Sequence, residues 1–241
     1  MKHWQAVVFD MDDTLYPERD YVLSGFRAVA EWSEQAFGIN ANDGYAHFHT
    51  LFTTGVRGDT FNRWLHHFQI IQPDSPREVI QQTVTPLIDV YRNHMPQIQP
   101  FPEAAALLPA LSKIYQLGVV SDGYEMVQQR KWAALNIASY FTAVVFSDHW
   151  GREAWKPSTK PFHEVLRGFA VAPEQAVYIG DNPRKDFLGA REVGMATIWL
   201  RRADGEYTAH EPPTAAHQPD EIIASWAALQ SELLPEKVYH T

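Results

Sequence analysis

The side chains best suited to chemistry follow a short apolar run near the N-terminus. Residues 6–9, Ala-Val-Val-Phe, lead directly into Asp10, Asp12, Asp13 and Thr14. The run is too short for a helix and predicts a buried strand, and ligands of open parallel sheets bind beyond the carboxyl ends of strands. Because crowded carboxylates repel one another, this cluster favours a bound cation. The structural alternative is an Asp that simply caps the next turn.

A second acidic cluster follows a later apolar run. Residues 176–179 lead into Gly180 and Asp181, and Asp186 lies a short distance further on. Either acid alone could cap a helix, but two such clusters at strand ends indicate a shared site. The chain has no cysteine, which excludes thiolate zinc sites, iron–sulfur clusters, disulfides and a Cys nucleophile. Among cations that take oxygen ligands, Mg²⁺ fits best.

Two weaker signals also follow predicted strands. Ser121, Asp122 and Gly123 come after one strand, where a hydroxyl and a backbone N–H could hold a phosphate oxygen. Lys156 follows the next strand and could neutralise developing negative charge. Taken alone, Ser-Asp-Gly is also a common turn, and Lys156 could be a surface lysine.

Short apolar runs and helical patterns organise most of the chain. The runs are residues 6–9, 117–120, 143–146, 176–179 and 196–200, and helices are predicted over 103–114, 124–135, 161–169 and 184–193. Both faces of each run are apolar, as in a parallel sheet covered on both sides. Alternating strands and helices predict βαβ units and a doubly wound α/β fold. The predicted helix over 124–135 carries Met126, Trp132 and Leu135 among its apolar residues.

Residues 16–98 break this rhythm and contain no convincing strand. Apolar and aromatic residues recur there at helical spacing in three stripes, within 22–37, 61–68 and 79–91. They predict the core of a helical module inserted between the first two strands. Near the C-terminus, residues 203–219 predict a surface loop and residues 220–234 an amphipathic helix.

The amino-acid composition limits the kinds of partner that the protein could bind. The 241 residues carry 20 basic and 29 acidic side chains, a formal charge of −9. That balance argues against non-specific binding to nucleic acid or to an anionic membrane. The N-terminus shows no signal-peptide pattern, and no apolar stretch approaches ~18 residues. We therefore expect a cytoplasmic protein without nucleic-acid or membrane partners, either a monomer or a homodimer.

Together, these motifs resemble those of the haloacid dehalogenase-like hydrolase superfamily over nearly the whole chain. The family pattern is Asp-x-Asp-x-Thr after a strand, a hydroxyl residue ending the next strand, Lys-Pro, and Gly-Asp followed by a second Asp. The matching residues are Asp10, Asp12, Thr14, Ser121, Lys156, Pro157, Phe162, Gly180, Asp181 and Asp186. This chain departs from the family in having Asp122 where many relatives have Asn, and in a second Lys-Pro pair at Lys160.

The resemblance implies a role for each matching residue. Asp10 would attack phosphorus and form an aspartyl-phosphate, while Asp12 would protonate the leaving oxygen and then activate water. Mg²⁺ would be held by Asp10, the carbonyl of Asp12 and Asp181, with Asp186 as an outer or alternative ligand. The phosphoryl group would be bound by a set comprising Met11, Thr14, Ser121, Asp122, Gly123 and Lys156.

The resemblance also implies the architecture. It predicts a Rossmann-like parallel sheet of order 3-2-1-4-5, which would bring the first and fourth strands together. Residues 1–15 and 99–241 would form the core domain, and residues 16–98 an inserted α-helical C1 cap that closes over the site.

Residues of the predicted cap and its hinge could recognise the substrate. The candidates are Tyr16, Glu18, Arg57 and Arg63, although for each of them a solvated surface residue is the favoured interpretation. Four histidines, His47, His49, His66 and His67, look like a metal cluster only by number, and we expect them to be ordinary helix residues.

A Mg²⁺-dependent phosphatase of a small phosphorylated metabolite is the predicted function. A sugar phosphate, a nucleotide or a small organic phosphate would suit a covered site, and true dehalogenases of the family lack the second Asp that Asp12 supplies here. The alternatives are a phosphomutase or pyrophosphatase of the same family, or a catalytically idle binding domain.

Overall fold

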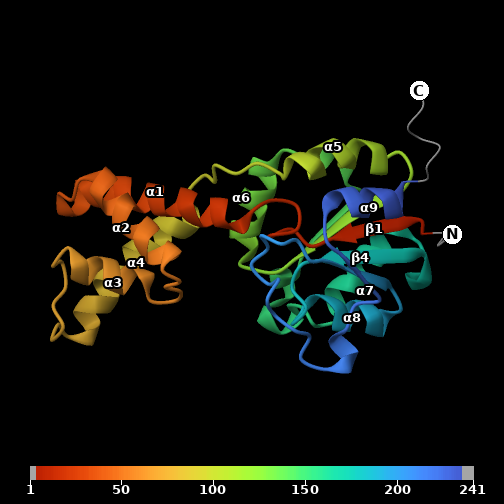
Figure 1. Cartoon of the computed structure of the whole chain (residues 1–241). Helices are drawn as coiled ribbons and strands as arrows, with labels where there is room; N and C mark the ends of the chain where they lie inside the picture. The colour runs from red at the N-terminus through yellow and green to blue at the C-terminus, as the bar shows by residue number, and fades with distance from the viewer. Residues whose placement is uncertain (1–3, 235–241) are drawn as a thin grey trace. The chain divides into compact units, whose positions relative to one another are not determined.

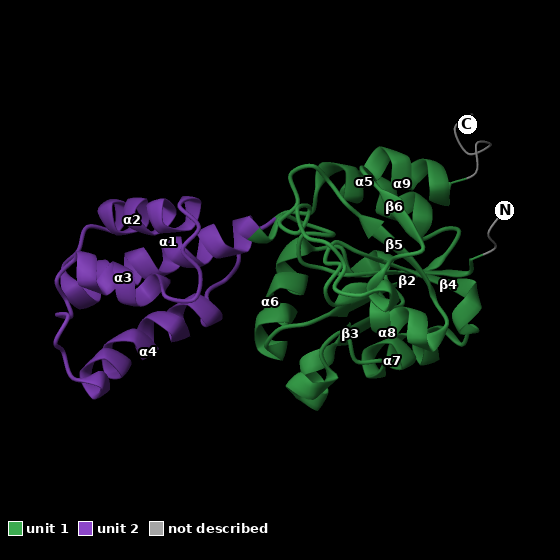
Figure 2. Ribbon diagram, turned by 60° about the horizontal axis from the view of Figure 1, so that its bottom comes forward, with its two compact units in different colours: residues 1–18, 99–241 green, residues 19–98 purple. Residues whose placement is uncertain are grey.

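The computed structural model describes residues 4–234 and divides the chain into two compact units. Unit 1 comprises residues 1–18 and 99–241, and unit 2 comprises residues 19–98 (Figure 2). Each unit has its own apolar core. The two ends of the predicted core domain, residues 1–3 and 235–241, lie outside the described residues.

Unit 1 is built on a parallel sheet of order β3-β2-β1-β4-β5-β6 (Figure 1). The strands are β1 (Ala6–Phe9), β2 (Gln116–Ser121), β3 (Ala143–Phe146), β4 (Ala176–Gly180), β5 (Ala196–Leu200) and β6 (Glu221–Ile223). The first five confirm the predicted order, and a sixth strand extends the sheet beyond β5. Because β1 pairs with both β2 and β4, it lies where the strand order reverses, which is where such sheets bind ligands.

Helices cover both faces of this sheet. They are α5 (Pro102–Leu111), α6 (Glu125–Leu135), α7 (Lys160–Phe169), α8 (Asp186–Val193) and α9 (Trp226–Leu233), and short 3₁₀ turns span 138–140, 147–150, 152–154, 173–175 and 215–217. Helices α5 and α9 lie on one face, and α7 and α8 on the other (Figures 1 and 2). Alternate residues of β1 serve the two faces: Phe9 stacks on Trp226 of α9, whereas Val8 belongs to the core that α7 and α8 complete.

Unit 2 is helical, as the three stripes predict. Its helices are α1 (Glu18–Phe37), whose first residue belongs to unit 1, α2 (Ala41–Thr53), α3 (Thr60–His67) and α4 (Arg77–Asn93). The aromatic rings form its core, with Phe48 stacked between Phe26 and Trp64 at centroid distances of 4.8 and 4.9 Å. The indole Nε1 of Trp64 donates to the Gly44 carbonyl at 2.8 Å, so this buried polar atom is satisfied. Among the described residues, no helix has the length and apolarity needed to cross a membrane.

The predicted helix over residues 220–234 is wrong in its first part. Residues 221–223 form β6, and α9 begins only at Trp226, after Ser225 has capped it by accepting a bond from the Ala228 N–H. The carboxylate of Asp220 accepts hydrogen bonds from the backbone N–H and the hydroxyl of Thr197, at 2.9 and 2.8 Å. These bonds tie the segment to β5, and this tertiary contact overrides the helical periodicity.

Replacing Asp220 tests that tie. Asp220→Ala removes two hydrogen bonds from a half-exposed carboxylate and should lower the free energy of unfolding by about 1–2 kcal/mol. Urea unfolding followed by circular dichroism measures it, with Glu192→Ala, an exposed acid on α8, as the control expected to stay within about 0.5 kcal/mol. An Asp220 variant as stable as this control would show that the hydrogen bonds between Asp220 and Thr197 do not stabilise the fold.

Candidate active site

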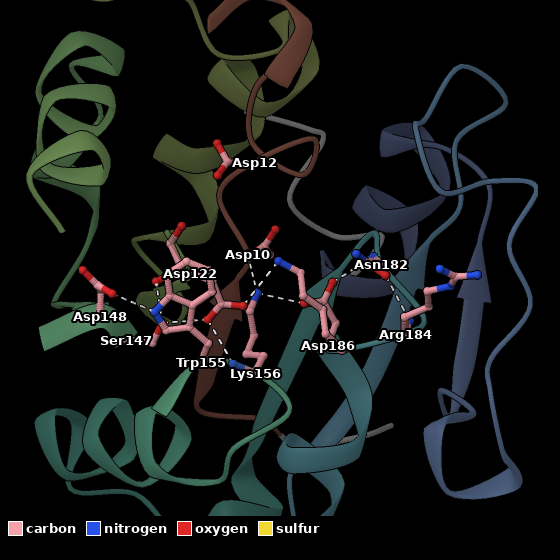
Figure 3. Close-up of polar contacts among 12 residues, drawn as sticks. Asp10, Asp12, Asp122, Ser147, Asp148, Trp155, Lys156, Asn182, Arg184 and Asp186 are labelled. Atoms are coloured by element: carbon pink, nitrogen blue, oxygen red, sulfur yellow. Dashed lines mark hydrogen bonds and ion pairs between the residues drawn. The ribbon is translucent and has the colours of Figure 1, made fainter. Parts of the chain in front are cut away.

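Asp10 lies at the carboxyl end of β1 and is 2% exposed. Its backbone N–H donates to the Ile179 carbonyl on β4 at 2.8 Å, which holds the end of β1 against its neighbour. The side chain therefore emerges at the switch point, near Asp186 (Figure 3). Because β1 and β4 are parallel and Phe9 pairs with Ile179, the residues that follow the two strands lie at the same edge of the sheet.

The ammonium of Lys156 lies among these acids. It forms ion pairs with Asp10 and, at 2.8 Å, with Asp186, and it donates a hydrogen bond to the Tyr178 hydroxyl at 2.8 Å. Burial alone would lower the pKa of Lys156, but the two carboxylates outweigh it and hold the pKa well above 10.5. Lys156 is therefore a charged, fully enclosed group. Lys160, the lysine of the second Lys-Pro pair, instead begins α7 and lies over the Trp150 ring.

Three buried carboxylates converge at this point. Asp10, Asp181 and Asp186 each place one oxygen within 4.8 Å of the others. Burial raises the pKa of Asp10 to about 7, with Lys156 opposing and Asp186 adding to the rise, and burial and Asp186 raise that of Asp181 well above 3.8. The Oδ2 atom of Asp181 is buried, and no described residue hydrogen-bonds to it. An unsatisfied buried carboxylate oxygen in an oxygen-only cluster fits a divalent cation.

A close backbone approach arranges the two acids after β4. The carboxylate of Asp186 accepts a hydrogen bond from the Asn182 N–H at 2.8 Å, and the Trp199 indole donates to the Asp181 carbonyl at 2.8 Å. A Cβ added to Gly180 would lie 2.4 Å from Asp186 Oδ2. Glycine is therefore required at position 180 because the carboxylate of Asp186 occupies the space that any side chain would need.

Asp12 is held on a different side of the site (Figure 3). Its Oδ1 atom accepts hydrogen bonds from the Tyr16 hydroxyl at 2.5 Å and from Lys131 at 2.8 Å, and its Oδ2 atom accepts one from Gln128 at 2.8 Å. Burial would raise the pKa of Asp12, but the Lys131 charge and these hydrogen bonds outweigh it and bring the pKa below 3.8. Asp12 is thus an ionised carboxylate with both oxygens engaged.

Asp122 connects the second predicted motif to Lys156. Its Oδ1 atom accepts hydrogen bonds from the Ser147 hydroxyl at 2.7 Å and from the Lys156 backbone N–H at 3.0 Å, and its Oδ2 atom pairs with Lys185 at 3.3 Å. Burial would raise the pKa of Asp122, but Lys156, Lys185 and these bonds lower it. Asp122 therefore fixes the backbone that carries Lys156. Its neighbour Ser121 ends β2, and its hydroxyl accepts a hydrogen bond from Gln128 at 2.7 Å.

The remaining residues of the predicted phosphate-binding set lie in the same two loops. Met11 and Thr14 are fully buried beside Asp10, and no described residue hydrogen-bonds to the Thr14 hydroxyl. Gly123 has φ +122°, a conformation that favours glycine.

Residues expected to read the substrate fall into two groups. Tyr16 and Glu18 belong to unit 1, where Tyr16 bonds to Asp12 and Glu18 lies 3.9 Å from Lys131. In unit 2, Arg57 donates to the carbonyl of Phe52, and Arg63 pairs with Asp59. The rings of His47 and His67 stack with centroids 3.7 Å apart, and the described residues contain no potential metal cluster that includes a histidine.

Sequence reasoning missed two polar residues of α6. Its buried residues are Gln128, Lys131 and Leu135, whereas Met126, expected on the apolar face, is 59% exposed. The spacing i, i+3, i+7 places the buried three on one face of the helix. A hydrophobicity pattern does not show this buried face, because two of its three residues are polar. Lys185, which pairs with Asp122, was also missed among the site residues.

Comparison with known proteins identifies similar hydrolases. A profile of haloacid dehalogenase-like hydrolases matches residues 7–200. The chain is 30% identical over 219 residues to the glyceraldehyde 3-phosphate phosphatase of Methanopyrus kandleri, covering 90% of this chain and 91% of that protein. A 2-haloacid dehalogenase structure from Pseudomonas syringae is 26% identical, with a TM-score of 0.61 and coverage of 95% and 97%. A magnesium-bound family hydrolase from Bacillus subtilis, 18% identical, shares the fold with a TM-score of 0.67 over 97% and 100%.

These matches define a hydrolase with a Rossmann-like parallel sheet. The chain belongs to the haloacid dehalogenase-like hydrolase family, and its named relatives place it on the phosphatase side of that family.

Replacing Lys156 tests the balance of buried charge. Lys156→Met would leave Asp10 and Asp186 without their ammonium, and we expect a loss of about 3–5 kcal/mol in the free energy of unfolding at pH 8. The loss should be smaller at pH 5, because the pKa of Asp10 is about 7 beside Lys156 and rises further without that charge, so its carboxyl takes up a proton at this pH. Chemical denaturation without added metal measures both values. A loss independent of pH would contradict the charge argument, and Lys160→Met is the matched control.

Proposed function

We propose that the protein is a Mg²⁺-dependent phosphatase that hydrolyses a small phosphorylated metabolite through an aspartyl-phosphate on Asp10. The observation that carries this proposal is the convergence of a strand-end carboxylate, a buried ammonium and two further buried acids, all within one unit. The relatives named as phosphatases support the class of substrate. Their names include glyceraldehyde 3-phosphate, phosphoserine and phosphoglycolate phosphatases, so they support a small phosphate ester without selecting one.

The chain's own side chains would divide the reaction between them. Asp10 would attack phosphorus, and Lys156 would offset negative charge on the transferring phosphoryl group. The Ser121 hydroxyl would donate to a phosphoryl oxygen. Asp12, which is ionised in the free protein, would have to take up a proton from solvent before it gives one to the leaving oxygen, and it would later take one from the attacking water. Asp12 also separates this site from that of a dehalogenase, for which a leaving-group proton donor has no use.

A divalent cation would be held by Asp10, Asp181 and the backbone carbonyl of Asp12, with Asp186 nearby. The unsatisfied Asp181 Oδ2 atom supports this assignment, and an oxygen-only donor set favours Mg²⁺. When bound, the ion would supply charge compensation for the phosphoryl oxygens. Residues 16–98 would serve as the cap that selects the substrate.

The nucleophile is tested by Asp10→Asn. Removing the attacking carboxylate should lower kcat on p-nitrophenyl phosphate by about 10³-fold or more. Steady-state kinetics with added Mg²⁺ measure this, with Asp74→Asn, an exposed acid of unit 2, as the control of unchanged activity. An Asp10→Asn variant that retained hydrolysis would overturn the mechanism.

Product analysis separates the phosphatase from the phosphomutase alternative. With a sugar phosphate and a bisphosphate primer, release of inorganic phosphate supports hydrolysis. An isomerised sugar phosphate without release would instead identify a mutase.

Cation binding should depend on pH. The pKa of Asp10 is about 7 without metal, so below pH 7 the ion must displace a proton from this carboxyl. The apparent affinity for Mg²⁺ should therefore rise by up to about tenfold per pH unit between pH 6 and 7 and change less above pH 7. Isothermal titration calorimetry across pH 6–8 measures it, and an affinity that falls with rising pH would contradict the assignment.

A further inference from the structure

Two polar side chains of α6 are buried without a role in the proposed reaction. Gln128 is 1% exposed and Lys131 is 3% exposed, and they lie one helical turn apart on the same face. Burying an ammonium group is costly unless an opposite charge lies beside it. Their burial therefore calls for an explanation in terms of what they contact.

Lys131 faces Asp12. Its Nζ atom lies 2.8 Å from Asp12 Oδ1 and 3.9 Å from Glu18 Oε1. The hydroxyl of Tyr16 donates to the same Oδ1 atom. Two donors thus hold one oxygen of the carboxylate from two directions.

Gln128 holds the other oxygen. Its Nε2 atom lies 2.8 Å from Asp12 Oδ2, 2.7 Å from the Asp122 carbonyl and 2.7 Å from Ser121 Oγ. An ionised carboxylate and a carbonyl only accept hydrogen bonds, so the side-chain atom facing them must be the NH₂ group. The amide orientation therefore follows from its surroundings. The two hydrogens of this group are shared among three acceptors, one of which is Ser121 Oγ, so the proton of Ser121 points elsewhere.

We propose that Gln128 and Lys131 are positioning residues that fix the carboxylate of Asp12 for proton exchange with the leaving group and water. The proposal rests on the function assigned above, in which Asp12 is the acid and base. With Oδ1 taken by two donors and Oδ2 by one, Oδ2 keeps an acceptor position and is the atom that exchanges the proton. A carboxylate displaced by as little as 1 Å can lose about 10²-fold in rate.

Leaving-group dependence tests this role. Esters with an activated aryl leaving group need little help from an acid, whereas alkyl phosphates need a well-placed one. We expect kcat/KM of Lys131→Met and Gln128→Leu to fall by about tenfold or less on p-nitrophenyl phosphate. On the best alkyl phosphate substrate it should fall by about 10²-fold or more. The readout is the ratio of the two kcat/KM values, which cancels any inactive fraction within a preparation.

Matched variants sharpen the outcome. Gln129→Leu changes the exposed neighbour on the same helix and should leave the ratio at the wild-type value, and Lys131→Arg, which keeps the charge, should restore much of it. Equal losses on both esters, or no loss, would overturn the positioning role even with an active wild type. A wild-type enzyme that hydrolyses neither ester would instead overturn the proposed function itself.

Discussion

The burial of like charges at the carboxyl end of β1 and β4 is the constraint around which unit 1 is arranged. Asp10, Asp181 and Asp186 converge there, and Lys156 is the ammonium placed among them. Burial raises the pKa of Asp10 and Asp181, the charge of Asp186 adds to both rises, and the nearby lysine charges offset only part of them. The formal charge of −9 says little about how a phosphate ester is received, because the local field depends on this lysine and on whatever cation the acids hold.

The surrounding loops keep Lys156 in place through the backbone. Asp122 accepts from the Lys156 N–H, and a Cβ added to Gly189 of α8 would lie 2.3 Å from the Pro157 carbonyl. The loop that carries the lysine is thus fixed by a side chain of the β2 loop and by the close approach of a helix. The geometry of the loop at Lys156 and Pro157 therefore depends on two distant segments of the chain, the loop after β2 and helix α8.

Much of this could be predicted because strands and their terminal residues are local features. Asp10 and Asp181 each follow an apolar run directly, and the parallel sheet brings such ends together. The polar face of α6 could not be predicted, since Gln128 and Lys131 are buried by contacts with Asp12 and not by their own hydrophobicity. β6 was missed for a related reason. Its register depends on Asp220 meeting Thr197, a contact between segments that no local pattern encodes.

Strand β6 also matters for the choice of a shorter fragment of the chain. The family profile ends at residue 200, the last residue of β5, whereas β6 pairs along β5 at Ile198, Trp199 and Leu200. A fragment ending at that boundary would leave the N–H and C=O groups of an apolar strand unpaired at the rim of the sheet. Such edges recruit strands from other molecules and promote aggregation. In the complete sheet, β6 pairs with the edge of β5 that such a fragment would expose.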